Sequence, residues 1–125
     1  MIKLLNFSHR KSLKRIIKIA SSEDMYISRK KNKFIGFFIE HKLVGIVGFY
    51  AIKKQKMIGF VSAYVLPQHR LKGIYKSLSE YRLQHSKEFY PGYSIYLTAN
   101  NNSKHQLEKL GFINVEPQYR MKLDL

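Results

Sequence analysis

The sequence predicts an α/β (α+β) protein in which a mixed sheet carries helices on its faces. Two observations predict this fold class. Strand-like runs alternate with three helical patterns, and the strands of the first half follow one another as an antiparallel series. A chain of 125 residues with 45% apolar residues also suits one compact domain, and no repeat or linker divides it. We therefore expect residues 1–125 to form a single domain.

The start of the chain predicts a short strand and then an amphipathic helix with a basic outer face. After the apolar opening, apolar side chains recur at the i, i+3, i+4 and i+7 spacing of a helix, and lysine or arginine fills the positions between them. A solvated helix face explains these charges without any partner, although they could also grip phosphates. The apolar positions are Leu13, Ile16, Ile17 and Ala20.

Three antiparallel strands are predicted next. The first two form a hairpin between Asn32 and Lys56, and Gly45 and Gly48 in its second strand indicate a bulge or a close backbone approach. A third strand covers Met57 to Leu66, and Pro67 ends it because proline cannot donate a ladder hydrogen bond. The turn of the hairpin is placed at Glu40, His41 and Lys42.

The second half predicts a central helix and a fourth core strand. The helix begins near Gly73 and runs to about Glu88, and Pro91-Gly92 then enforces a turn before a strand at Ser94 to Ala99. The inward-facing positions of this helix are predicted to be Ile74, Leu78 and Tyr81.

A short helix and a final pair of strands complete the prediction. Asn102 or Ser103 caps the helix, and Gly111 stands where a left-handed C-terminal cap is expected. Its inner face consists of Leu107 and Leu110, and the two strands cover residues 112–115 and 119–125.

Composition excludes several kinds of function. The chain has no cysteine, which removes disulfides, thiolate zinc sites and a cysteine nucleophile, and its five histidines show no metal-ligand spacing. We expect no metal site. The opening residues are interrupted by charge too early for a signal peptide, and no apolar run approaches the roughly 20 residues that span a bilayer. We therefore expect a soluble, cytoplasmic, reducing location and no membrane partner.

The charge balance predicts an anionic partner. The formal net charge is +15. Residues 1–56 hold 14 basic and 3 acidic side chains, whereas residues 57–125 hold 9 and 5. Such a field attracts anions whatever the fold, and any electrostatic docking face belongs mainly to the first half.

A phosphate-binding loop is predicted where the third strand meets the central helix. A strand that turns directly into a helix directs unpaired N–H groups and the positive end of the helix dipole at one point. Gly73 lets the backbone approach a ligand closely, and Arg70 and Lys72 add charge that suits a pyrophosphate.

Two blocks of sequence resemble the GNAT family of N-acetyltransferases. Arg70-x-x-Gly73 before a helix resembles the family signature Arg/Gln-x-x-Gly-x-Gly/Ala, and Leu107-Glu108-Lys109-Leu110-Gly111-Phe112 is similar to the end of its later helix. The blocks stand about 40 residues apart in the family's order, and together they outweigh the alternative of a simple turn and an ordinary helix cap. With the strands around them, the resemblance spans residues 33–125.

The resemblance implies a fold, an activity and a binding site. The fold is a mixed, mostly antiparallel central sheet of about six to seven strands with helices on both faces. The activity is transfer of an acetyl group from acetyl-CoA to a primary amine by direct attack, with an N–H near Val65 polarising the carbonyl. The residues implied to bind the cofactor are Val65, Arg70, Leu71, Lys72, Gly73, Ile74, Tyr75, Lys76, Asn100 and Ser103.

The chain departs from the family at two positions. The sixth position of the signature is Tyr75 instead of glycine or alanine, so this bulky side chain must point away from the cofactor. The family often has a tyrosine four residues before Gly111 to protonate the departing thiolate, and that position is Leu107. The third strand also has no carboxylate to serve as a general base. The candidates for acid or base are Tyr64, Tyr96 and Tyr119, although a packing role with a satisfied hydroxyl is the favoured interpretation of each.

The acceptor and the assembly stay open. The basic first half favours an amine displayed on something anionic, such as nucleic acid, a ribosome or an acidic protein, and disfavours polyamines. The alternative function is a catalytically weak or inactive module of the same fold that binds nucleic acid or another anionic partner. A regulatory protein that binds CoA for stability is a third alternative, and the terminal strands allow pairing across a homodimer.

Overall fold

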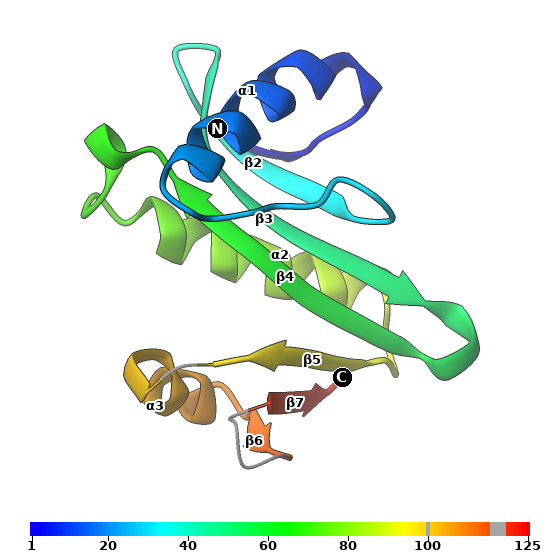
Figure 1. Ribbon diagram of the computed structural model, residues 1–125. Helices are drawn as coiled ribbons and strands as arrows, with labels where there is room; N and C mark the ends of the chain where they lie inside the picture. The colour runs from blue at the N-terminus through cyan, green and yellow to red at the C-terminus, as the bar shows by residue number, and fades with distance from the viewer. Residues whose placement is uncertain (100, 116–119) are drawn as a thin grey trace.

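Seven strands form one sheet in the computed structural model, which describes residues 1–99, 101–115 and 120–125 (Figure 1). The strand order is β1-β2-β3-β4-β5-β7-β6, and every neighbouring pair is antiparallel except β4 and β5. Helices lie on both faces, which confirms the predicted fold class. The strands are β1 (Ile2–Leu4), β2 (Lys33–Ile39), β3 (Lys42–Ile52), β4 (Met57–Val65), β5 (Ser94–Thr98), β6 (Ile113–Asn114) and β7 (Arg120–Asp124).

Helix α1 (Arg10–Ser22) packs its apolar stripe on one face of the sheet, over β3. Ile16 and Ala20 are fully buried, and Leu13 and Ile17 pack partly buried against the same core, as the sequence spacing predicts. We call this face the α1 side of the sheet. Because the stripe faces inward, the basic residues between its members face solvent.

The hairpin of β2 and β3 turns at the predicted residues. Glu40 and His41 both have positive φ, at 48° and 67°, and a two-residue turn of this kind matches the twist of the two strands. The close approach predicted for Gly45 is confirmed, because a Cβ there would lie 3.2 Å from side-chain atoms of Ile74 and Leu78. Helix α2 (Ile74–Phe89) therefore packs directly on the backbone of β3, on the face opposite α1.

A β-bulge interrupts the pairing of β3 with β4. Gly48 pairs with Val61 and Val47 pairs with Ala63, so Ser62 is the extra residue, and its φ is 48°. The bulge predicted from the glycines of β3 is confirmed, because Ser62 of β4 is inserted beside the partner of Gly48, and Val44 of β3, next to Gly45, is inserted in the pairing with β2. The bulge at Ser62 changes the direction of β4 just before the strand reaches the phosphate loop.

Helix α2 departs from its predicted inward face. Ile74 and Leu78 are buried as predicted, but Tyr81 is 37% exposed and Arg82 is buried instead. The stripe continues at i+4 from Leu78, and the buried guanidinium is accommodated because its Nη1 donates hydrogen bonds to the carbonyls of Gly48 (2.8 Å) and Val61 (3.1 Å). Arg82 thereby bridges the bulge.

Helix α3 (Asn101–Lys109) starts earlier than predicted. Asn102 and Ser103 lie inside it, so neither is its cap. Leu107 packs against the core as predicted, but Leu110 is 57% exposed because the helix has ended and the chain is turning. Gly111 has a φ of 97°, which confirms the left-handed cap.

The last strands are shorter than predicted. β5 ends at Thr98, β6 contains only Ile113 and Asn114, and β7 ends at Asp124. Tyr119 and Asn100 lie outside the described residues. In the described part of the chain, no helix is long and apolar enough to span a membrane.

Candidate active site

The parallel pair of strands separates after three residue pairs. β4 pairs with β5 only from Met57 to Gly59, whereas β5 pairs with β7 along its whole length. Figure 1 shows the two strands diverging toward the start of α2. The edge of β4 from Phe60 to Val65 therefore has no ladder to β5, and the N–H groups on that edge have no partner in a neighbouring strand.

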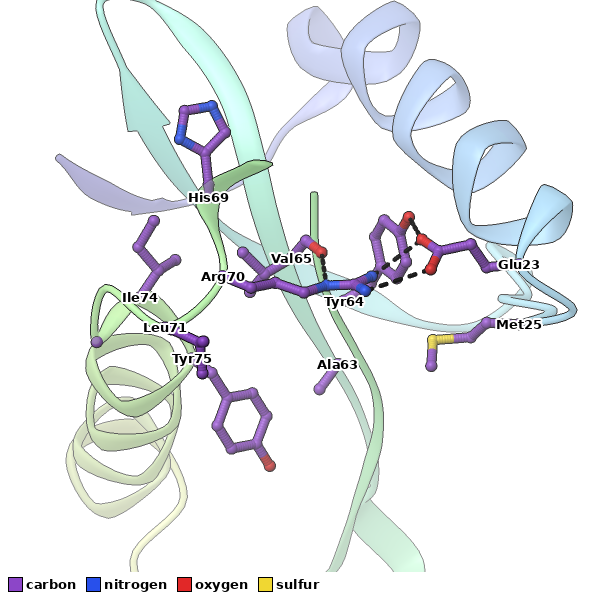
Figure 2. Close-up of a pocket in the computed structure, with 11 residues that line it drawn as sticks. Glu23, Met25, Ala63, Tyr64, Val65, His69, Arg70, Leu71, Ile74 and Tyr75 are labelled. Atoms are coloured by element: carbon purple, nitrogen blue, oxygen red, sulfur yellow. Dashed lines mark hydrogen bonds and ion pairs between the residues drawn. The ribbon is translucent and has the colours of Figure 1, made fainter. Parts of the chain in front are cut away.

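A cleft of about 510 Å³ lies along this edge. Neighbouring residues of a strand point to opposite faces, and Tyr64 lies on the α1 side while Ala63 and Val65 lie on the α2 side. All three line the cleft, which therefore passes across the edge of β4 from one face to the other (Figure 2). The other lining residues are Glu23, Met25, His69, Arg70, Leu71, Gly73, Ile74 and Tyr75.

The predicted phosphate loop forms the α2 side of the cleft. A 3₁₀ turn at Pro67–His69 ends β4, and Gly73 is the N-cap of α2 with a φ of 79°. The first intrahelical hydrogen bond runs from the N–H of Ser77 to the carbonyl of Gly73 (3.0 Å), so the N–H groups of residues 74–76 have no partner within the helix. No side chain caps this end.

Space and charge at this helix start suit an anion. A Cβ placed on Gly73 would meet no atom within 4 Å, so the approach to the loop is open. Leu71 precedes it with a φ of 63° and a fully exposed side chain, and Lys72 and Lys76 are exposed beside it. The loop thus offers N–H groups without a partner in the helix, the positive end of a helix dipole and two exposed ammonium groups to a phosphate group, although that of Lys76 also lies 4.0 Å from Glu80.

Arg70 points from the loop toward the α1 side. Its Nε donates to the carbonyl of Val65 (2.9 Å), and its two terminal nitrogens form a bidentate ion pair with Glu23 at 2.9 and 3.2 Å. The guanidinium charge is therefore largely matched within the protein. The other exposed cations of this loop are Lys72 and Lys76.

Glu23 and Tyr64 are joined on the α1 side of the cleft. The Tyr64 hydroxyl donates a hydrogen bond to Glu23 (Figure 2). This bond, and then the bonds from Arg70, lower the pKa of Glu23. Burial, and then the Glu23 carboxylate, raise the pKa of Tyr64. At neutral pH Glu23 is therefore ionised and Tyr64 keeps its proton, and loss of that proton would place two anions in contact.

Among the other predicted site residues, Tyr75 lines the cleft. Its side chain extends from α2 along the cleft instead of pointing away from it (Figure 2). Tyr96 lies on β5 outside the cleft lining, with the guanidinium of Arg120 4.9 Å from its ring centroid. Ser103 is half-buried in α3 and also lies outside that lining. Asn100 and Tyr119 are not among the described residues.

Sequence reasoning missed Glu23, Met25 and His69. Glu23 lies 41 residues from Tyr64 and 47 from Arg70 along the chain, so no local pattern predicts their contact. The one local signal is that Glu23 and Asp24 are the first acidic residues, directly after a helix that has none. In the described residues, no cluster of three or more histidine, aspartate or glutamate side chains could hold a metal ion.

The fold and the cleft place the chain in the class of α/β proteins that can receive a phosphate-bearing ligand at a strand–helix junction. A family model described as an acetyltransferase (GNAT) domain matches residues 5–122, and the chain therefore belongs to this family. Among curated proteins, none matches the chain.

Solved structures share this fold. ElaA of Escherichia coli superposes with a TM-score of 0.75 at 15% identity, over 98% of this chain and 97% of that one. A GNAT family acetyltransferase from Brucella melitensis, in complex with acetyl-CoA, superposes with a TM-score of 0.76 at 14% identity, over 100% of this chain and 87% of that one. PaiA N-acetyltransferase from Thermoplasma acidophilum, in complex with coenzyme A, superposes with a TM-score of 0.65 at 14% identity, over 100% of this chain and 98% of that one. At these identities the likeness establishes the fold alone.

Proposed function

We propose that this protein is an acetyl-CoA-dependent N-acetyltransferase that moves an acetyl group to a primary amine by direct attack. The observation that carries the proposal is the open anion site at the start of α2, which leads into a cleft across the unpaired edge of β4. Membership of the GNAT family supports it, as do the two similar structures that hold acetyl-CoA or coenzyme A.

The α2 side of the cleft would bind the cofactor. The N–H groups of residues 74–76 and the ammonium groups of Lys72 and Lys76 would hold the pyrophosphate, because these N–H groups have no partner within the helix and both side chains are exposed beside them. Gly73 leaves room for that approach. Arg70 would act as a brace, since its side chain already joins Val65 to Glu23.

The reaction would take place at the edge of β4. An N–H group on this edge, near Val65, would polarise the acetyl carbonyl, and the amine would enter from the α1 side past Glu23 and Tyr64. The amine nitrogen bonds to the carbonyl carbon, the carbon–sulfur bond breaks, and CoA leaves as the thiolate. Because Leu107 offers no proton and Tyr64 holds its own tightly, the proton of the amine and the proton for the thiolate would pass through solvent or another tyrosine. Tyr96 and Tyr119 remain candidates for either transfer.

Titration calorimetry with acetyl-CoA tests the proposal through a matched pair of variants. Gly73→Glu places a carboxylate in the phosphate loop, and Gly92→Glu does the same in the turn after α2. Both glycines have positive φ, at 79° and 84°, and open space where a Cβ would stand, so the backbone strain is the same. We expect saturable binding by the native chain, at least tenfold weaker binding by Gly73→Glu, and unchanged binding by Gly92→Glu. Absence of native binding, or equal loss in both variants, would contradict the proposal.

A second candidate function is a binding module of the same fold without useful turnover. The observation that favours it is Leu107, which packs against the core where the family often has its proton donor. Release of free CoA thiol in the presence of a panel of primary amines separates the two functions. Thiol release above the rate of uncatalysed hydrolysis supports the transferase, and acetyl-CoA binding without release supports the module.

A further inference from the structure

The outer face of α1 concentrates positive charge without any acid. Thirteen residues form this helix, and none is aspartate or glutamate. Like charges at i, i+4 spacing repel one another, and cations in the first turn oppose the helix dipole, so this arrangement costs stability in the isolated protein. Its exposed cations are Arg10, Lys11, Lys14, Arg15 and Lys18.

These charges are unmatched in the described part of the structure. Ion pairs among the described residues join Arg70 to Glu23, Lys76 to Glu80 and Lys122 to Asp124, and no described carboxylate lies within 4.0 Å of a cation of α1. In the cleft, by contrast, the carboxylate of Glu23 matches the charge of Arg70. A polyanion would relieve the repulsion along α1.

Exposed aromatic rings stand at both ends of this basic helix. Phe7, just before α1, is 77% exposed, and Tyr26, just after it, is 79% exposed. The Arg10 guanidinium lies 4.3 Å from the centroid of the Phe7 ring, so the ring already supports a flat cationic group. Nucleobases stack on such rings, whereas the side chains of an acidic peptide do not.

We propose that α1 and these two rings form a surface that binds single-stranded nucleic acid. The phosphates contact the cations of α1, and bases stack on Phe7 and Tyr26. The helix of 13 residues is about 20 Å long, which accommodates several nucleotides. The pairing of unmatched cations with exposed rings favours nucleic acid over an acidic protein.

This surface ends beside the cleft. The C-terminal end of α1 is capped by Glu23, which lines the cleft, and Met25 beside Tyr26 lines it too. A single-stranded nucleic acid bound along α1 would therefore extend to the α1 side of the cleft. An amine carried by that nucleic acid would be the acceptor, a step that rests on the proposed function, whereas the binding surface itself does not.

Fluorescence anisotropy of a labelled 20-nucleotide single-stranded RNA tests the proposal. The test variant carries K11Q, K14Q, R15Q and K18Q, and the control carries K53Q, K54Q, K56Q and K87Q, which are also exposed and change the net charge equally. We expect the native chain to bind, the control to bind within threefold of it, and the α1 variant to bind at least tenfold more weakly. The slope of log affinity against log salt should fall by about 3, from four lost phosphate contacts at roughly 0.7 each. Tyr26→Ala should weaken binding severalfold at every salt concentration.

Several outcomes would overturn the inference. Equal losses in the α1 variant and the control would show that net charge alone drives binding. Tighter binding of poly-glutamate than of RNA would assign the surface to an acidic protein. Full affinity of Tyr26→Ala for the RNA would show that bases do not stack on this ring, and the argument for nucleic acid over an acidic protein would be lost. Circular dichroism and melting curves of each variant exclude unfolding as the cause. Titration of the same α1 variant with acetyl-CoA should be unchanged, so failure of the cofactor site and failure of this surface are read separately.

Discussion

Arg70 and Glu23 form a bidentate ion pair, with nitrogen–oxygen distances of 2.9 and 3.2 Å, that joins the start of the phosphate loop to the end of α1. The same carboxylate accepts the hydroxyl proton of Tyr64 on β4. The end of α1 is thus tied on one wall of the cleft to β4 and to the loop that follows it, 41 and 47 residues further along the chain. The cleft is consequently shaped by electrostatic contacts as well as by the packing of the core.

Glu23→Gln should lower stability in a pH-dependent way. Contacts lower the pKa of Glu23 in the folded state. Its contribution to the free energy of unfolding is therefore present above the unfolded-state pKa of about 4.3, and it is lost as the pH falls through the lower pKa of the folded state. We expect the native chain to melt above the variant at pH 7, and the two melting temperatures to converge in acid. A constant difference down to pH 3 would contradict this. Asp24→Asn is the control, since Asp24 is the adjacent acid and takes no part in the Arg70–Glu23–Tyr64 contacts.

Arg82→Met should destabilise the fold and disturb the cleft together. The change leaves the carbonyls of Gly48 and Val61 without their buried donor, which costs about 1 to 3 kcal/mol. Since those carbonyls flank the bulge at Ser62, acetyl-CoA affinity should also fall. Urea unfolding and calorimetry measure the two effects. Arg82→Lys should recover part of both, and an unchanged unfolding midpoint in the methionine variant would show that the bulge does not need this bridge.

Leu107→Tyr should raise the rate of acetyl transfer. It places a phenol at the position where the family often has its proton donor, and general acid catalysis typically contributes a hundredfold or more. We expect kcat to rise at least tenfold with an acceptor found in the amine panel, while the affinity for acetyl-CoA stays the same. Leu107→Phe is the matched control because it has the ring without the hydroxyl. An equal change in both variants would reveal a packing effect instead.

Lys72→Gln and Lys76→Gln should each weaken acetyl-CoA binding in a salt-dependent way. Both side chains are exposed beside the start of α2, so their attraction for a pyrophosphate is screened by ions. We expect a loss of roughly three- to tenfold at low salt that shrinks at 0.5 M. Lys53→Gln, in the exposed turn between β3 and β4, should have no effect. A loss that does not depend on salt would indicate a structural role.

The fold could be predicted well because its signals are local. The stripe from Leu13 to Ala20, the turn at Glu40-His41 and the glycine cap at Gly111 each depend on neighbouring residues, and each is confirmed. The burial predictions were wrong at residues whose polarity does not match their exposure to solvent. Arg82 is buried because carbonyls of a distant bulge accept its protons, and Leu110 is exposed because the helix ends before it.

The candidate site was predicted only on its α2 side. The phosphate loop is one continuous segment, so its composition and the glycine at its helix start are visible in the sequence. The α1 side depends on contacts between Glu23, Tyr64 and Arg70, which are set by the packing of α1 on the sheet. No spacing rule encodes such a contact. For the same reason, the sequence could not indicate that Arg70 would be held by a carboxylate.

The short ladder between β4 and β5 has a mechanical consequence. Only three residue pairs connect the half of the sheet that carries β1 to β4 with the half that carries β5 to β7. The two ladders next to this seam are longer, with eight residue pairs between β3 and β4 and five between β5 and β7, so bending at Met57–Gly59 disturbs fewer hydrogen bonds than opening either of them. If the acceptor proposed above required a wider wedge between β4 and β5, the ladder hydrogen bonds that would have to break are those of this narrow seam and not those of the whole sheet.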